Sequence, residues 1–227
     1  MPAHITILSA GAVQPGLSRV IDAFRRETGV DVKVTFATAP AIRKRLSSAD
    51  TADLVIAPPD LLDEVAATGT SQCEDRRTIG RIGVGVAVRD GASVPKIATV
   101  AEFKQSLLDA ESIVYNQAST GIYLEGLFDR LGISMQIKDK TTRYPDFAAV
   151  REHISKGNQH EIGFGATTVL IENASKGLKF VGPLPAEIQN YTTYAAIVMV
   201  PEPAAAALLA YLTSPAATKL LKSAGIE

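Results

Sequence analysis

Cysteine and tryptophan are almost missing from this chain of 227 residues, which has one cysteine, Cys73, and no tryptophan. A single cysteine excludes an internal disulfide and every metal site built from several thiolates. The motifs of zinc proteases, serine hydrolases and phosphate-binding P-loops are missing as well. We therefore expect no bound metal and no cofactor.

An excess of charge of one sign is also missing. The chain has 23 lysines and arginines and 24 aspartates and glutamates, which gives a formal net charge of −1. Without a basic field that holds phosphates, we expect no binding to nucleic acid.

Long hydrophobic runs are missing too. The run 194–200 is only strand-sized, well short of the roughly 18 apolar residues that span a bilayer, so we expect no membrane insertion. The first nine residues lead directly into a strand pattern and lack the features of a signal peptide. Two locations stay open: periplasmic if a leader was trimmed, and cytoplasmic if Met1 is the native start.

Strand and helix patterns alternate along the chain. Strand-like runs at 5–8, 30–36 and 53–57 are each followed by an amphipathic helical run, and a second series of this kind covers 100–181. This order predicts an α/β fold with a mostly parallel sheet.

Two long strand patterns, at 80–88 and 192–200, bound the second series. They predict two Rossmann-like α/β lobes joined by a two-strand hinge, with a ligand cleft between the lobes. Lobe 1 would comprise residues 1–82 and 196–227, and lobe 2 residues 83–195. One continuous α/β domain is the alternative.

In 80–88 the glycines alternate with isoleucine and valines, which favours a strand with one close-packed face over a dinucleotide-binding loop.

Several expected helices begin with residues typical of helix starts. Pro15, Pro40, Ser119 and Asp146 mark four such positions. A helix start carries unpaired backbone N–H groups and the positive end of the helix dipole. In α/β sheets these starts lie beside the carboxyl ends of the strands, where ligands bind. Four starts at one cleft predict a site for a small anion, although ordinary capping explains each start alone.

Six motifs occur in a familiar order and cover nearly the whole chain. They are ITILSAGAVQPGL (5–17), VTFATAPAIRKRL (34–46), ADLVIAP (52–58), TGIYLEGL (120–127), EIGFG (161–165) and YLTSPAA (211–217). On these motifs the chain resembles the type II periplasmic solute-binding proteins, most closely the molybdate-binding family. The resemblance implies an anion held by helix N-termini and hydroxyls, and an ABC permease as partner. We expect a monomer.

The chain departs from that family at its side-chain donors. The serine of the family's first loop falls on Ala12, the second loop keeps only Thr38, and a family tyrosine falls on Ala166. Each lost donor costs a desolvated oxyanion roughly 1–3 kcal/mol, and smaller residues widen the cleft. We therefore expect an organic carboxylate rather than molybdate, held in part by Arg43 and Arg143. Exposed arginines without a ligand role are the alternative for these two.

The resemblance predicts one set of ligand-binding residues for a solute-binding protein that serves an ABC-type importer. They are Ser9, Gly11, Ala12, Thr38, Ala39, Arg43, Ser119, Thr120, Gly121, Arg143, Phe147 and Ala148.

An enzyme on the same fold is the alternative function. Some relatives of the family resemble isomerases of unsaturated tricarboxylates, such as aconitate isomerase. That chemistry needs a base near an acidic carbon and stabilisation of the enolate-like state. The residues leave the base open among a carboxylate of the cleft and the side chains of Tyr115, Tyr123, Tyr144, Tyr191, Tyr194 and His153.

Overall fold

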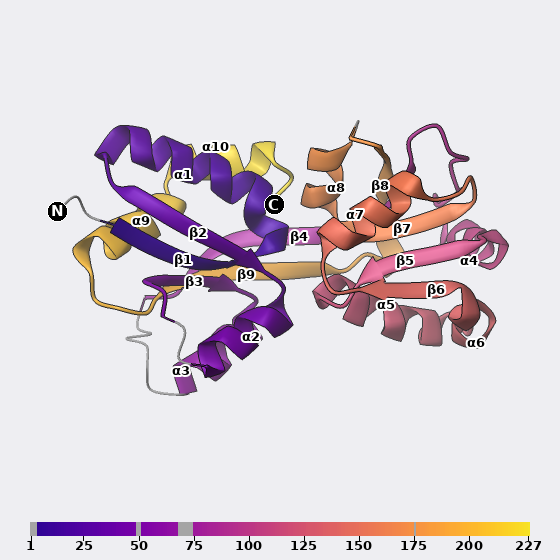
Figure 1. Cartoon of the computed structure of the whole chain (residues 1–227), viewed down its shortest axis with the longest axis horizontal. Helices are drawn as coiled ribbons and strands as arrows, with labels where there is room; N and C mark the ends of the chain where they lie inside the picture. The colour runs from indigo at the N-terminus through magenta and orange to yellow at the C-terminus, as the bar shows by residue number, and fades with distance from the viewer. Residues whose placement is uncertain (1–3, 49–50, 68–74, 175) are drawn as a thin grey trace. The chain divides into compact units, whose positions relative to one another are not determined.

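The computed structural model describes residues 4–48, 51–67, 75–174 and 176–227 (Figure 1). The contacts within the chain divide it into two compact units. Unit 1 comprises Met1–Ile82 and Thr192–Glu227, and unit 2 comprises Gly83–Tyr191. The chain passes from unit 1 to unit 2 within β4 (Arg77–Arg89) and returns at the start of β9 (Tyr191–Val198). Cys73 lies outside the described residues.

The sheet of unit 1 is mostly parallel. Its strands are β1 (His4–Ala10), β2 (Asp31–Ala37), β3 (Leu54–Ala57) and β9, in the order β2-β1-β3-β9. β1 runs parallel to β2 and β3, and β9 runs antiparallel to β3. Because β1 is the central parallel strand, its carboxyl end lies beside those of both neighbours.

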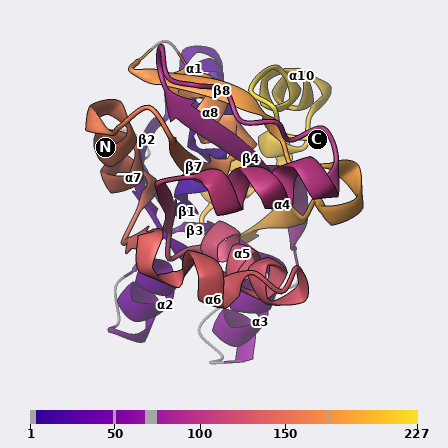
Figure 2. The ribbon, with the colours of Figure 1, turned by 90° about the vertical axis from the view of Figure 1, so that its right-hand side faces the viewer.

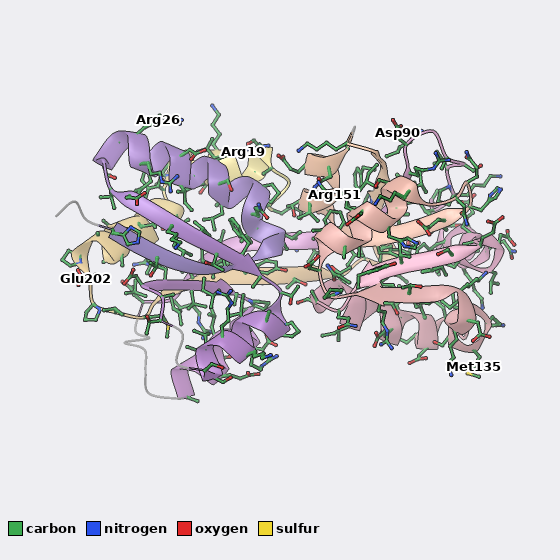
Figure 3. All side chains as sticks on the ribbon, in the orientation of Figure 1. Arg19, Arg26, Asp90, Met135, Arg151 and Glu202 are labelled. Carbon is green, nitrogen blue, oxygen red and sulfur yellow. The ribbon has the colours of Figure 1, made fainter. Side chains whose placement is uncertain are left out.

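Helices cover both faces of this sheet. They are α1 (Gln14–Thr28), α2 (Ala39–Ser47), α3 (Pro59–Ala67), α9 (Pro203–Leu212) and α10 (Pro215–Ser223), with a 3₁₀ turn at Gly11–Val13 before α1. α1 packs on α9 and α10, whereas α2 packs on α3 across the sheet. On the outer side of α1, Arg19 donates to the Ser223 carbonyl at 3.1 Å and thereby joins α1 to α10 (Figure 3).

Among the described residues no single helix is long and apolar enough to cross a membrane, and α9 with α10 reaches that length only across a 60° bend.

Unit 2 repeats the parallel arrangement. Its strands are β4, β5 (Ser112–Asn116), β6 (Thr141–Tyr144), β7 (Glu161–Ala166) and β8 (Leu178–Pro183). β5 lies parallel to and between β6 and β7, and β4 runs antiparallel to β7 and β8. The expected close-packed face of β4 is confirmed, since a Cβ added to Gly85 would lie 2.8 Å from the Phe180 ring.

The helices of unit 2 also divide between the two faces of its sheet. They are α4 (Val100–Asp109), α5 (Ser119–Arg130), α6 (Ser134–Ile137), α7 (Phe147–Lys156) and α8 (Thr167–Asn173), with 3₁₀ turns at Lys138–Lys140 and Ala186–Ile188. α4, α5 and α6 share one buried cluster with the strands, and α7 packs on the opposite face with its own cluster. Figure 2 shows α4, α5 and α6 in front of that sheet.

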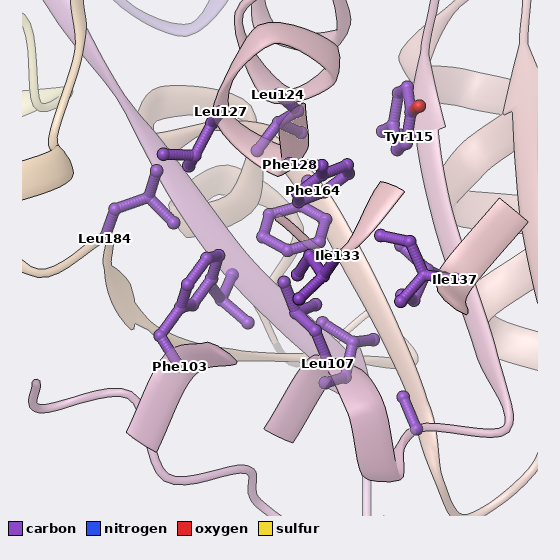
Figure 4. Close-up of a cluster of buried hydrophobic side chains, with 14 of the residues drawn as sticks. Phe103, Leu107, Tyr115, Leu124, Leu127, Phe128, Ile133, Ile137, Phe164 and Leu184 are labelled. Atoms are coloured by element: carbon purple, nitrogen blue, oxygen red, sulfur yellow. The ribbon is translucent and has the colours of Figure 1, made fainter. Parts of the chain in front are cut away.

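Aromatic rings form the centre of the α4–α6 cluster (Figure 4). The ring of Phe164, which is fully buried, meets Phe103 at 6.0 Å and Phe128 at 6.2 Å between centroids, both edge to face. Phe128 also meets Tyr115 edge to face at 6.1 Å. Such pairs add to the hydrophobic burial, so Phe164 links a strand to two helices.

Truncation of Phe164 tests this packing. We expect Phe164→Ala to lower the free energy of unfolding by about 3–5 kcal/mol, because it removes two ring contacts and leaves a cavity. Met135→Ala is the control, since Met135 on α6 is 81% exposed (Figure 3). Chemical denaturation measures both, and equal losses for the two variants would contradict this account of the core.

Candidate functional site

The carboxyl ends of β1 and β2 bring together the predicted residues of unit 1. Ala10 pairs with Ala37 in the parallel register, and a Cβ added to Gly11 would lie 3.9 Å from the Ala37 carbonyl oxygen. The chain turns into α1 after the first strand and into α2 after the second. Ser9, Gly11, Ala12, Thr38 and Ala39 therefore lie at one sheet edge.

The two helices at this edge begin without a capping hydrogen bond from a side chain, among the described residues. Within the described part of the chain, the side chains of Val13 before α1 and Thr38 before α2 make no capping hydrogen bond. Ser9 is fully buried at the end of β1, and its hydroxyl makes only a long 3.3 Å hydrogen bond to the Ala10 carbonyl. At α1 the Gln14 N–H donates to the Gly11 carbonyl and Pro15 has no N–H, so the helix end that faces this edge is the preceding turn Gly11–Val13. Among the described residues no cap side chain bonds the N–H groups that begin this turn or α2, which leaves them to water or a ligand.

The guanidinium of Arg43 is already bonded within the chain. Arg43 lies on α2 and donates from Nε and Nη2 to the two carboxylate oxygens of Glu64 on α3, at 2.6 and 2.9 Å. The hydrogen bonds raise the pKa of Arg43 and lower the pKa of Glu64. The predicted carboxylate fork therefore already holds a carboxylate of the chain.

In unit 2 the start of α5 lies against the end of β5. A Cβ added to Gly121 would lie 1.9 Å from the Asn116 carbonyl oxygen, so the first turn of α5 needs glycine there. Among the described residues, no side chain caps α5, which begins after Ala118. We call the beginnings of α1, α2 and α5 the open helix starts. Ser119, Thr120 and Gly121 form the one in unit 2.

α7 begins at the same edge, because β5 and β6 end side by side. Asn116 pairs with Tyr144, and the Gln117 N–H donates to the Tyr144 carbonyl at 2.9 Å. Phe147 and Ala148 form the first turn of α7, next to Asp146, whose carboxylate accepts from the Ala149 N–H at 2.9 Å. This start already has a negative cap, which makes it a weaker anion site than α5.

The starts of α1 and α2 are distinguished by lying at one sheet edge of unit 1, since α9 also lacks a side-chain cap among the described residues. α4 and α10, by contrast, are capped by Thr99 and Ser214.

Arg143 lies on β6, and its guanidinium reaches α5, on the face of the sheet opposite α7. Its Nη1 donates to the Glu125 carboxylate at 2.6 Å, which raises the pKa of Arg143. The same cluster includes Tyr115, whose pKa rises to about 12, chiefly because of burial and secondarily because of Glu125. Burial likewise raises the pKa of Tyr194 to about 12. At neutral pH both phenols keep their protons, which disfavours them as the base of an isomerase.

Two other base candidates, Tyr144 and His153, form a hydrogen bond with each other beside α7. The Tyr144 hydroxyl lies 2.6 Å from His153 Nδ1, and His153 Nε2 lies 2.8 Å from Glu161 Oε2. The Glu161 side chain is 2% exposed, and its Oε1 has no partner among the described residues. Gly157 leaves room for it, since a Cβ there would lie 2.2 Å from Oε1. This chain of side chains joins β6, α7 and β7 and so holds α7 on the sheet.

Asn116 belongs to the unit 2 edge and was missed in the sequence. It ends β5 after three buried apolar residues and is itself 8% exposed. A buried asparagine at the carboxyl end of an apolar strand is the signal that was available.

A hollow in unit 1 lies away from the starts of α1 and α2. It has a volume of about 390 Å³ between α1 and β2. His4 and Asp31, which lie 3.2 Å apart at the beginnings of β1 and β2, line it together with Arg25 and Lys33. It therefore lies at the amino ends of these strands, opposite the candidate site.

Comparison with known families gives the assignment. The family model for bacterial extracellular solute-binding proteins matches residues 5–227. The chain belongs to this solute-binding family. The family expected from the six motifs is thereby confirmed, and a small-molecule ligand with it.

One relative of this solute-binding protein carries an enzyme's name. An aconitate isomerase from a Pseudomonas species is 31% identical over 233 residues, which cover 98% of this chain and 87% of the relative.

Solved structures share the fold at low identity. The Azotobacter vinelandii periplasmic molybdate-binding protein has a TM-score of 0.82 at 15% identity, with 98% of each chain covered. The sulfate-binding protein SubI of Mycobacterium tuberculosis has a TM-score of 0.77 at 17% identity, with 99% of this chain and 86% of SubI covered. L-phospholactate-bound PEB3 has a TM-score of 0.75 at 15% identity, with 97% of this chain and 98% of PEB3 covered. The solute-binding protein has the type II periplasmic binding protein fold.

Removal of His153 tests the account of α7. We expect His153→Leu to lower the free energy of unfolding by about 2 kcal/mol or more, because the buried Glu161 carboxylate loses its hydrogen bond. The double variant His153→Leu/Glu161→Leu removes the buried charge as well, and we expect it to be more stable than the single variant. Lys156→Ala, an exposed change on the same helix, is the control. Chemical denaturation decides, and a double variant less stable than His153→Leu would contradict the account.

Proposed function

We propose that this solute-binding protein captures a small organic anion, and specifically a carboxylate, at its open helix starts. The observation that carries the proposal is that in each unit these starts lie at the carboxyl edge of the parallel strands, which favours an anionic ligand. Ala12 and Ala166 stand where the resemblance places a hydroxyl and a phenol, which favours an anion wider than molybdate.

The relatives support the organic character of the ligand. PEB3 was solved with L-phospholactate, and aconitate isomerase acts by its name on a tricarboxylate. In our proposal the ligand's carboxylates also compete for Arg43 and Arg143. The ion pairs of these arginines with Glu64 and Glu125 are about half exposed, and exposed pairs contribute only about 0–1 kcal/mol.

The remaining parts of the proposal follow from a receptor role. The protein would be a monomer that delivers its ligand to an ABC permease, in the periplasm if a leader is removed.

Calorimetry with citrate, the aconitates, molybdate and sulfate at matched ionic strength tests this function. We expect at least one carboxylate to bind at least about tenfold more tightly than molybdate. Ala12→Ser restores one hydroxyl and should shift the preference toward molybdate by up to about tenfold. Submicromolar binding of molybdate without heat from any carboxylate would refute the proposal.

An isomerase is the second candidate, favoured by the 31% identity to aconitate isomerase over 98% of this chain. A base would remove a proton from a carbon next to a carboxylate, the double bond would shift, and a proton would return to the other allylic carbon. The open helix starts would stabilise the enolate-like state.

Proton NMR of cis- or trans-aconitate in D₂O with the protein separates the two candidates. Interconversion with deuterium uptake at the shifted carbon would favour the isomerase. Binding without conversion or exchange would favour the receptor.

A further inference from the structure

Asn116 is a buried polar side chain with an unused donor at the unit 2 edge. It follows the buried residues Ile113, Val114 and Tyr115 on β5 and is 8% exposed. A buried amide without its hydrogen bonds costs roughly 1–3 kcal/mol, so the donor of this side chain must meet either water or a ligand.

The orientation of the Asn116 amide follows from its neighbour. Its Oδ1 accepts from the Ala118 N–H at 3.1 Å. Because a backbone N–H can only donate, the atom that faces it is the oxygen, and Nδ2 is the remaining group. Nδ2 has no hydrogen-bond partner among the described residues, and it is not among the fully buried unsatisfied atoms, so it reaches the surface.

The amide and the open start of α5 lie together. Ala118, to which Oδ1 is bonded, is the residue from which α5 begins. Gly121 in the first turn packs directly on the Asn116 carbonyl. The side-chain NH₂ of Asn116 and the backbone N–H groups of Ser119 and Thr120 therefore belong to the same end of β5, within three residues of the Ala118 N–H that fixes the amide.

We propose that Asn116 contacts the ligand and determines its specificity: Nδ2 donates to a carboxylate oxygen of the anion at the start of α5. The inference rests on the proposed function, because it deepens the same site. A neutral donor aimed at the anion selects groups that accept hydrogen bonds, and an acidic residue in its place would repel them.

Asn158 provides a matched control for this asparagine. Its Oδ1 also accepts from the backbone N–H two residues on, at His160 and 3.0 Å, but it lies in an exposed loop. Aspartate keeps this local bond at both positions, because it forms the same turn as asparagine. In both variants a carboxylate oxygen replaces Nδ2. The variants differ in the surroundings of that oxygen, which lies at the start of α5 in Asn116→Asp and in an exposed loop in Asn158→Asp.

Calorimetry of the two variants with the tightest-binding anion of the panel tests the inference. We expect Asn116→Asp to weaken binding at least a hundredfold, through the lost donor and the added charge, and Asn158→Asp to change it less than twofold. Asn116→Ala should weaken binding about tenfold. If circular dichroism shows that Asn116→Asp is unfolded, Asn116→Ala becomes the test variant.

The outcomes separate this inference from the proposed function. Retained affinity in the Asn116 variants overturns the role of Asn116 alone, as does an equal loss in Asn158→Asp. A wild-type protein that binds only molybdate or sulfate overturns the organic ligand, and the Asn116 variants are then measured with that oxyanion. A wild-type protein that binds none of the anions overturns both.

Discussion

Parallel strand pairing decides where the helices of both units begin. Each helix that follows a parallel strand must start at the carboxyl edge of the sheet, because the chain leaves the strand there. β1 and β2 place α1 and α2 in this way, and β5 and β6 place α5 and α7. Within each unit the two helix starts therefore lie at one sheet edge, whatever the side chains are. The anion site that we propose depends on this backbone arrangement more than on any single residue.

Local signals in the sequence were enough for most of the fold. Gly29 ends α1 and Gly132 follows α5, with φ angles of 71° and 67° that glycine adopts at no steric cost, so glycine marks both helix ends in the sequence. β6 at 141–144 gives no clear strand pattern in the sequence, because it is short, at the sheet edge and half polar. α6 at 134–137 was missed for a related reason, since one helical turn shows no periodicity.

The candidate site was less visible in the sequence, because its contacts are long-range. The helix starts near Pro40 and Ser119 could be placed from local residue types. The partners of Arg43 and Arg143 could not, since Glu64 and Glu125 lie 21 and 18 residues away. For Asn116 the sequence offers only its position after an apolar strand, and its burial, which sets it apart, is visible in the structure alone.

Backbone amide shifts in ¹⁵N-labelled protein, titrated with the tightest-binding anion, test the central claim most directly. The account predicts large shifts at the N–H groups that begin α2, α5 and the Gly11–Val13 turn before α1, with the capped starts of α4 and α10 unchanged. Shifts centred instead on the hollow between α1 and β2, or on the capped starts, would contradict it.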